Sequence, residues 1–98
     1  MKLTENQVAT IIYEKVAGDV TTRTILPTSI PTDLVRAIDV TELPISEREE
    51  LVKLYTEYRE YVEQFKSTMF KFETWVEHTQ GKKIEPKWRS FKANGLRD

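Results

Sequence analysis

Two stretches of β-forming residues open the chain and meet at a short polar turn. Outside its centre, the segment 8–27 is rich in Val, Ile, Thr and Tyr, which suit a pleated, half-buried strand. At the centre, Gly18 can adopt the positive φ of a tight turn, and Asp19 tolerates it. The segment therefore predicts a β-hairpin. Pro27 and Pro31 lack a backbone N–H, so we expect them to end its second strand.

Two further short segments have β-like patterns. Residues 35–40 predict a third strand, in which Val35, Ala37 and Asp39 alternate, imperfectly, with Arg36, Ile38 and Val40. Residues 87–92, which follow Pro86, alternate cationic or polar residues with aromatic ones. They predict a half-buried closing strand with Trp88 and Phe91 as its apolar anchors. Because these two aromatics are three positions apart, they cannot share a face unless a bulge intervenes.

The chain between these strands has helical periodicity. Apolar residues from Leu51 to Val76 recur at spacings of three and four, which is the stripe of an amphipathic helix. One helix over 46–80 would be unusually long for so small a domain. We therefore expect a bend or break near Ser67 and Thr68, with a second helix of about ten residues after it.

Cap signals mark both ends of this helical segment. Ser46 with Glu49 three residues later has the pattern of a capping box, in which each side chain accepts a free backbone N–H. Gly81 is suited to the C-terminal cap. The order of elements predicts an α+β fold, in which inserted helices cover a small antiparallel sheet.

Length and composition predict one domain, residues 1–98, with a single modest core. A hydrophobic content of 39% with 32% charged residues is ordinary for a globular protein and too apolar for a disordered one. No apolar run approaches the roughly 20 residues that span a bilayer, and the N-terminus lacks the apolar core of a signal peptide. We expect no membrane contact and a cytoplasmic location. The absence of cysteine agrees with a reducing compartment.

The charges are distributed unevenly. Residues 42–77 contain nine acidic and five basic residues, whereas residues 82–98 contain six basic and two acidic ones. The two ends of the fold are therefore expected to present opposite electrostatic fields.

Three segments resemble WYL-type domains. Residues 12–27, with a glycine-containing turn and Arg23 four positions before Pro27, resemble the family's opening hairpin. Residues 35–40 resemble the strand that usually carries the Trp-Tyr-Leu signature, and 88–92 is similar to the closing aromatic-Arg-x-Phe-Arg strand. The same plan resembles small accessory proteins of T4-like bacteriophages. The Trp-Tyr-Leu triplet itself is absent, and a helical insert replaces what is usually a short loop.

The resemblance implies an SH3-like or Sm-like barrel that senses a ligand, with basic residues that receive nucleotides or nucleic acid. Arg23, Arg89 and Lys92 match those basic positions, and Lys87 adds charge to the same strand. Cations neutralise phosphates and aromatic rings stack on unpaired bases, so these four residues are candidate nucleic-acid or ligand contacts. The alternative interpretation is a solvated edge strand whose aromatics belong to the core.

The aromatic residues of the helical segment are a second candidate site. Most are expected to pack on the sheet, but their number exceeds what one small barrel can cover. The candidate protein interface comprises four residues: Tyr58, Tyr61, Phe65 and Trp75. Its partner would be a host or phage protein, or a second copy of the chain.

No motif in the chain indicates catalysis or a bound cofactor. His78 is the only histidine, and Glu57 with Glu60 is typical of a solvated helix face. We therefore expect no enzyme activity, no cofactor and no metal. The sequence predicts a phage-type accessory or regulatory module that binds a protein through its aromatic helical surface. Its fold would be an SH3-like sheet or partial barrel, and the alternative function is a nucleotide or nucleic-acid sensor. The predicted elements are the hairpin 8–27, the strands 35–40 and 87–92, and the inserted helical segment 46–80.

Overall fold

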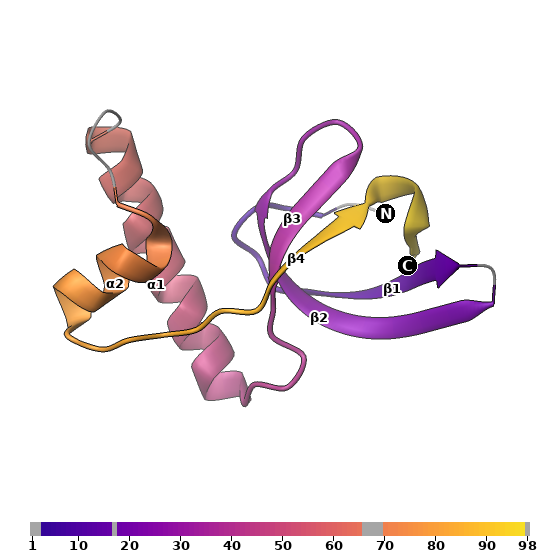
Figure 1. Cartoon of the computed structure of the whole chain (residues 1–98), viewed down its shortest axis with the longest axis horizontal. Helices are drawn as coiled ribbons and strands as arrows, with labels where there is room; N and C mark the ends of the chain where they lie inside the picture. Colours follow the sequence, from indigo (N-terminus) through magenta and orange to yellow (C-terminus); the bar gives the residue numbers. More distant parts are fainter. Residues whose placement is uncertain (1–2, 17, 66–69, 98) are drawn as a thin grey trace.

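The computed structural model describes residues 3–16, 18–65 and 70–97, which form an α+β fold. Two helices lie between the third and fourth strands in sequence and to one side of the sheet in space (Figure 1). The elements in chain order are β1 (Ala9–Val16), β2 (Asp19–Ser29), β3 (Leu34–Asp39), α1 (Ile45–Gln64), α2 (Phe72–Gln80), β4 (Trp88–Lys92), the 3-10 turn η1 (Ala93–Gly95) and β5 (Leu96–Arg97). The predicted fold class and the insertion of helices are confirmed.

The sheet is antiparallel and curled, but it is open. Its strand order is β4-β3-β2-β1-β5, so β4 and the two-residue β5 are its opposite edges. The three residues of η1 join these edges, so they must lie close together in space. Within the described residues no hydrogen-bonded ladder links β4 to β5, so the predicted closure into a barrel is not found.

The hairpin forms as predicted at its turn but extends further at its end. Gly18 has φ of 84°, the left-handed conformation expected of it. The prediction that Pro27 ends the second strand is wrong, because β2 continues to Ser29 and Pro27 pairs with Ala37 of β3. The register shifts between Pro27 and Ser29, and proline is tolerated at such irregularities because its missing N–H is not needed there.

The other two strands lie within one residue of their predicted positions. The third strand was expected over 35–40 and is Leu34–Asp39. The closing strand was expected over 87–92 and is Trp88–Lys92, which pairs with the third.

The helical segment divides into two helices, as expected. The predicted break at Ser67 and Thr68 lies outside the described residues. Gly81 ends α2 with φ of 68°, and its N–H donates to the Glu77 carbonyl at 3.0 Å, which confirms the predicted cap.

The predicted capping box at the start of α1 is wrong. The N-cap is Pro44, with φ of −59° and an extended ψ, and it makes no side-chain capping hydrogen bond. Because the helix begins at Ile45, Ser46 lies inside the first turn, where its hydroxyl cannot cap. The fixed φ of proline thus starts the helix earlier than the Ser46 pattern indicates.

Apolar residues on both faces of the sheet form two cores. The buried residues of the inner core all belong to strands and lie on the face around which the sheet curls: Ile11, Ile25, Val35, Ala37 and Phe91. Leu3, Tyr13, Ile30 and Leu96 are partly buried and pack against them. The outer core joins the other face to the helices: Leu26, Ile38, Val40, Leu54, Phe72, Trp75 and Val76. Consecutive residues such as Ile25 and Leu26 enter different cores because neighbouring side chains of a strand point to opposite faces.

The two aromatics of β4 separate in the same way. Phe91 is buried in the inner core and meets the Tyr13 ring edge-on, with ring centroids 5.0 Å apart. Trp88 lies on the other face and is 43% exposed, so the prediction that it anchors the core is wrong. Its indole N–H donates to Glu73 Oε2 at 3.1 Å, which holds β4 against α2.

Candidate functional site

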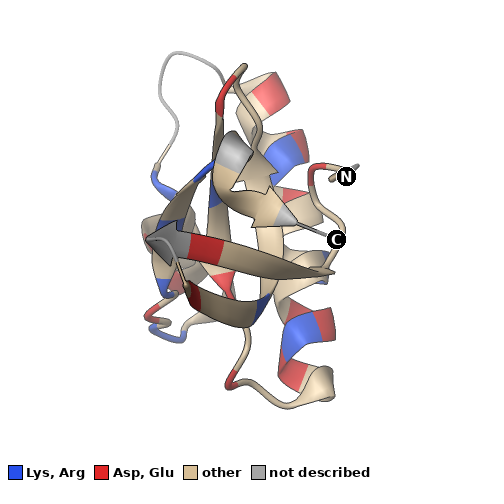
Figure 2. Ribbon diagram, turned by 90° about the vertical axis from the view of Figure 1, so that its right-hand side faces the viewer, with Lys and Arg blue, Asp and Glu red and all other residues tan. Residues whose placement is uncertain are grey.

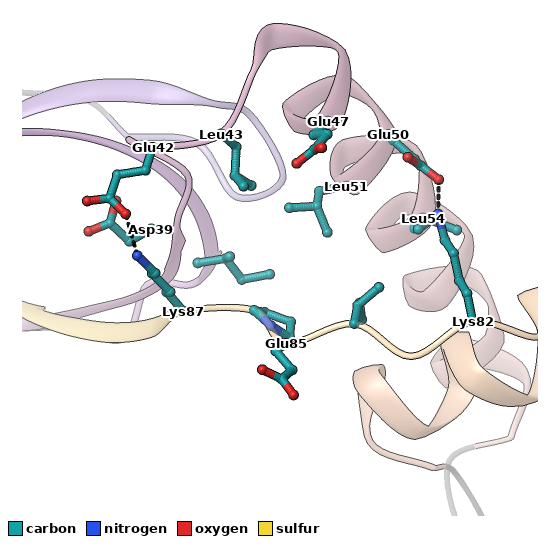
Figure 3. A pocket seen from close by; sticks show the side chains of 13 residues that line it. Asp39, Glu42, Leu43, Glu47, Glu50, Leu51, Leu54, Lys82, Glu85 and Lys87 are labelled. Carbon is teal, nitrogen blue, oxygen red and sulfur yellow. Dashed lines mark hydrogen bonds and ion pairs between the residues drawn. The ribbon is translucent and has the colours of Figure 1, made fainter.

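A pocket of about 460 Å³ lies where β3, α1 and the segment 82–87 meet (Figure 3). The segment 82–87 links α2 to β4 and belongs to neither a helix nor a strand. Ligand pockets of proteins usually have volumes of about 300 to 1,000 Å³, so this one is large enough for a small molecule or for side chains of a peptide.

The floor of the pocket is apolar. Ile38 of β3 contributes its side chain from one side, and Leu51 and Leu54 of α1 contribute from the other. The remaining apolar lining residues are Leu43, Ile84 and Pro86. The helix wall follows from spacing, because Glu47, Glu50, Leu51 and Leu54 are separated by three, four and seven positions and therefore share one helix face.

The rim of the pocket is charged, and two ion pairs stand at its sides. Lys87 Nζ donates to Glu42 Oε2 at 2.6 Å, and Lys82 Nζ donates to Glu50 Oε1. The hydrogen bond and charge of Lys87 lower the pKa of Glu42 below its usual range. Both pairs are solvent-exposed, so they are worth little to stability but mark the two ends of the opening.

Two rim carboxylates have no such partner. Glu47 and Glu85 make no ion pair or side-chain hydrogen bond within the part of the chain that the structure describes. In Figure 3, the Glu47 carboxylate points from α1 toward the middle of the opening, above Leu51, whereas Glu85 points away from it. Glu47 belongs to the first turn of α1, where the helix dipole favours a negative charge.

Arg48 holds the loop that forms one wall of the pocket. Its Nε donates to the carbonyls of Val40 and Leu43, both at 3.0 Å, and its Nη2 donates to the carbonyl of Thr41 at 3.1 Å. Arg48 was not among the predicted site residues. A signal existed, because a basic residue in the acidic first turn opposes the helix dipole and therefore needs another reason to be there.

A buried carboxylate, Asp39, gathers the predicted cationic residues beside the pocket. Asp39 is only 5% exposed, and its Oδ2 lies 2.9 Å from Arg89 Nε and 3.9 Å from Arg23 Nη1. Its Oδ1 accepts hydrogen bonds from the Thr41 hydroxyl at 2.5 Å and the Thr41 N–H at 3.0 Å. Burial raises the pKa of Asp39, but the Thr41 hydrogen bonds and the two arginine charges outweigh it, so the net shift is downward. We call these four residues the Asp39 cluster.

The structure thus brings together three of the four predicted nucleic-acid contacts. Arg23 and Arg89 share Asp39, and the Lys87 carbonyl accepts the Asp39 N–H at 2.8 Å. Lys92 lies apart at the far end of β4, opposite Leu34. The acids that accompany these bases were not predicted, although Asp39 directly after Ala37 and Ile38 in a β-like segment was a signal of such a partner.

The predicted aromatic interface is largely an internal contact between α1 and α2. Trp75 is 8% exposed, and its ring centroid lies 5.6 Å from that of Tyr58 and 6.0 Å from that of Tyr61. The Tyr58 hydroxyl donates to the Phe70 carbonyl at 2.7 Å, and the Phe70 N–H donates to the Tyr61 hydroxyl at 2.9 Å. These contacts explain why most of the stripe faces inward.

Two phenylalanines at one end of the helix pair remain open to solvent. Phe65 is 50% exposed and its ring lies against that of Tyr61. Phe70 is 47% exposed; its N–H donates to the Tyr61 hydroxyl and its ring stacks on His78. We call Phe65 and Phe70 the aromatic tip. Phe65 was among the predicted interface residues, whereas Phe70 was not.

The described residues include no cluster suited to a metal ion, and α1 presents charges of both signs. Within residues 3–16, 18–65 and 70–97, no three His, Asp or Glu side chains are placed to share a metal ion. None of the helices described is both long and apolar enough to cross a membrane. Acidic and basic residues are interspersed along α1 (Figure 2).

Comparison with known proteins found no similarity to report. A scan against protein-family models, a search of the curated proteins and a search of the solved structures each returned no match for this chain.

Proposed function

We propose that this protein is a non-enzymatic accessory or regulatory module that binds a partner protein through its aromatic tip. The observation that carries the proposal is the uneven exposure of its aromatic residues. Phe65 and Phe70 are half exposed at one end of the helix pair, while Trp75 of the same stripe is buried. Aromatic side chains exposed together are typical of a protein interface.

The finer fold supports the same proposal. The strand order β4-β3-β2-β1-β5, with a short 3-10 turn between the edge strands, is the arrangement we expect of an SH3-like partial barrel. The resemblance of the strands to WYL-type domains and phage accessory proteins favours a phage-encoded module that acts in the host cytoplasm. The helix pair, inserted between β3 and β4, supplies the binding surface.

Partner capture with matched variants tests this proposal. The immobilised protein is compared with Phe65→Ser/Phe70→Ser, which removes the aromatic tip, and with Val20→Ser/Ile45→Ser, which changes two exposed apolar residues elsewhere. Host proteins bound to each are identified by mass spectrometry. We expect a partner that the first variant loses and the second retains, with all three proteins folded by circular dichroism. Partners retained equally by both variants would contradict the proposal.

Self-association requires a separate measurement. A second copy of the chain would bury the same aromatic tip, so sedimentation velocity at high protein concentration is run on the wild type and on Phe65→Ser/Phe70→Ser. A dimer that the variant abolishes would identify the partner as the chain itself. A monomer in both leaves the host or phage protein as the partner to seek.

Nucleic-acid binding is the second candidate function, and one observation favours it. The Arg23 and Arg89 side chains are 31% and 47% exposed, so both retain donors that face solvent while they share Asp39. If they contact phosphates, binding of a labelled single-stranded oligonucleotide should weaken steeply with salt. At a given salt concentration, Arg89→Ala/Lys92→Ala should bind the oligonucleotide more weakly than the wild type does. No binding at low salt would remove this candidate.

A further inference from the structure

The pocket combines an apolar floor with unpaired negative charge. Five carboxylates and two ammonium groups line it, and the two ammonium groups are held by Glu42 and Glu50. Asp39 is neutralised by its arginines. Glu85 points away from the opening, so the charge left over there belongs to Glu47, and the opening repels anions and attracts cations. A ligand that fits must therefore have an apolar part for the floor and a positive group for the rim.

Glu47 is the group best placed to receive that positive charge. Its carboxylate points over the opening, and Leu51 lies four positions further along the same helix face (Figure 3). An arginine or lysine next to an apolar residue that rests on Leu51 and Ile38 would bring its cationic end to this carboxylate. Charge-assisted hydrogen bonds of this kind are about twice as strong as neutral ones.

The wall opposite α1 has free backbone groups. Lys83, Ile84 and Glu85 are in neither a helix nor a strand, and no backbone hydrogen bond from their N–H groups or to their carbonyls occurs within the described residues. An extended segment beside an opening can pair with a second extended chain, as in peptide recognition by strand addition. This wall suits a peptide better than an isolated small amine.

We propose that the pocket binds an extended peptide segment of a partner protein in which basic and apolar residues alternate. Alternation places apolar side chains on the floor and cationic ones toward Glu47, because neighbouring side chains of an extended chain point to opposite sides. The inference deepens the proposed protein-binding function and rests on it for the class of partner. The site itself is separate from the aromatic tip, so it names a second contact.

A titration followed by NMR tests the site directly. The probe is a short synthetic peptide of alternating leucine and arginine, added to the 15N-labelled full chain and followed by 1H–15N correlation spectra. The largest shifts are expected at the amides of 82–85, Lys87, Glu47 and Leu51. Shifts concentrated at Phe70, or no saturable shifts, would overturn the proposal. Peptides with glutamate in place of arginine, or serine in place of leucine, should bind at least about tenfold more weakly.

Paired variants separate the pocket from general surface charge. Glu47→Gln removes the carboxylate that points over the opening and should weaken the leucine–arginine peptide about five- to tenfold. Glu49→Gln makes the same change two residues further along α1, at a side chain that does not line the pocket. It should alter the peptide affinity by less than about twofold. Equal losses in both variants would show that only net charge matters, which would overturn the proposal.

The result is distinguishable from failure of the proposed function. Phe65→Ser/Phe70→Ser should leave the peptide affinity unchanged, because the aromatic tip does not line the pocket. If the peptide does not bind while the aromatic tip still captures a partner, the pocket inference fails and the proposed function stands. If the peptide binds at the pocket but Phe65→Ser/Phe70→Ser retains every partner, the pocket inference stands and binding through the aromatic tip fails.

Discussion

The two cores of this protein share one sheet but are completed in different ways. The buried residues of the inner core all belong to strands, and the curl that brings η1 and β5 back to β1 covers them together with Leu3 and Ile30. The outer core depends on two helices that reach the sheet through bulky side chains such as Leu54 and Trp75. Because the helices cover that face only partly, they leave the pocket at one end and the aromatic tip at the other.

The charges follow the same contrast. The Asp39 cluster is satisfied internally, with both carboxylate oxygens of Asp39 occupied. At the pocket, Glu47 is left without an ionic partner in the described chain. The paired charges thus lie within the sheet, whereas the unpaired one lies at the junction between helices and sheet, where we propose that a partner binds.

The largest expected effect distinguishes the two cores by stability. Phe91→Ala removes the one buried ring described in the inner core and should lower the free energy of unfolding by about 4 kcal/mol, a large part of the total for a small domain. Trp75→Ala should cost about 3 kcal/mol, because the partly exposed Tyr58 and Tyr61 can move into the space. Urea denaturation followed by circular dichroism measures both.

The spectrum of each variant sharpens the comparison. After Trp75→Ala, amide resonances of the hairpin should keep their positions, whereas Phe91→Ala should broaden or move them. If Trp75→Ala disturbs the hairpin as strongly as Phe91→Ala does, the two cores form one cooperative unit and the contrast between them fails.

The next largest effect is the contribution of the Asp39 cluster to stability and its dependence on pH. The pKa of Asp39 is lower in the folded chain than its ordinary value of 3.8, so the unfolded chain takes up the proton first as the pH falls. The stability from this carboxylate is therefore complete above the unfolded pKa and is lost as the pH falls through the folded pKa. Asp39→Asn should cost about 2 kcal/mol at neutral pH, moderated because both arginines reach solvent.

Unfolding measured between about pH 7 and pH 2 checks this assignment. The wild type should lose more stability than Asp39→Asn on acidification, so the two curves converge at low pH. Parallel curves would mean that Asp39 does not titrate differently in the folded and unfolded chains, and the cluster would then be a weaker support of the sheet than its geometry indicates.

The smallest effect is expected at the start of α1. Ser46→Ala should change the free energy of unfolding by less than about 0.5 kcal/mol, because Ser46 lies inside the helix and makes no capping bond. A true cap would cost about 1 kcal/mol. A loss of that size in urea denaturation would show that Ser46 caps the helix and that α1 begins after it.

Local signals explain what the sequence predicted well. The hairpin turn at Gly18 and the helix end at Gly81 depend on one residue's access to positive φ, which composition reveals directly. The strands and the stripe of α1 likewise follow from the period of apolar residues along a few turns or a few strand positions. The start of α1 was harder to predict, because Pro44 and Ser46 are both possible N-cap positions. The backbone conformation shows that the N-cap is Pro44.

The candidate sites depended on contacts between distant parts of the chain. Asp39 meets Arg23 and Arg89 from two other strands, and Glu47 overlooks a pocket whose opposite wall is Ile84. Exposure was equally undetermined, since Trp75 and Phe65 belong to the same aromatic set but only Phe65 reaches solvent.

The sequence by itself determined the elements of this protein: a glycine-turned hairpin, two further strands and an amphipathic helical insert, each encoded by neighbours within one turn or one strand. Only the tertiary structure decided that the sheet stays open, that Asp39 pairs with Arg23 and Arg89, and that a pocket forms beside α1. The physical reason is that these features depend on how far the sheet curls and where the helices settle on it. Those distances are set by the packing of the whole chain and not by the spacing of residues along it.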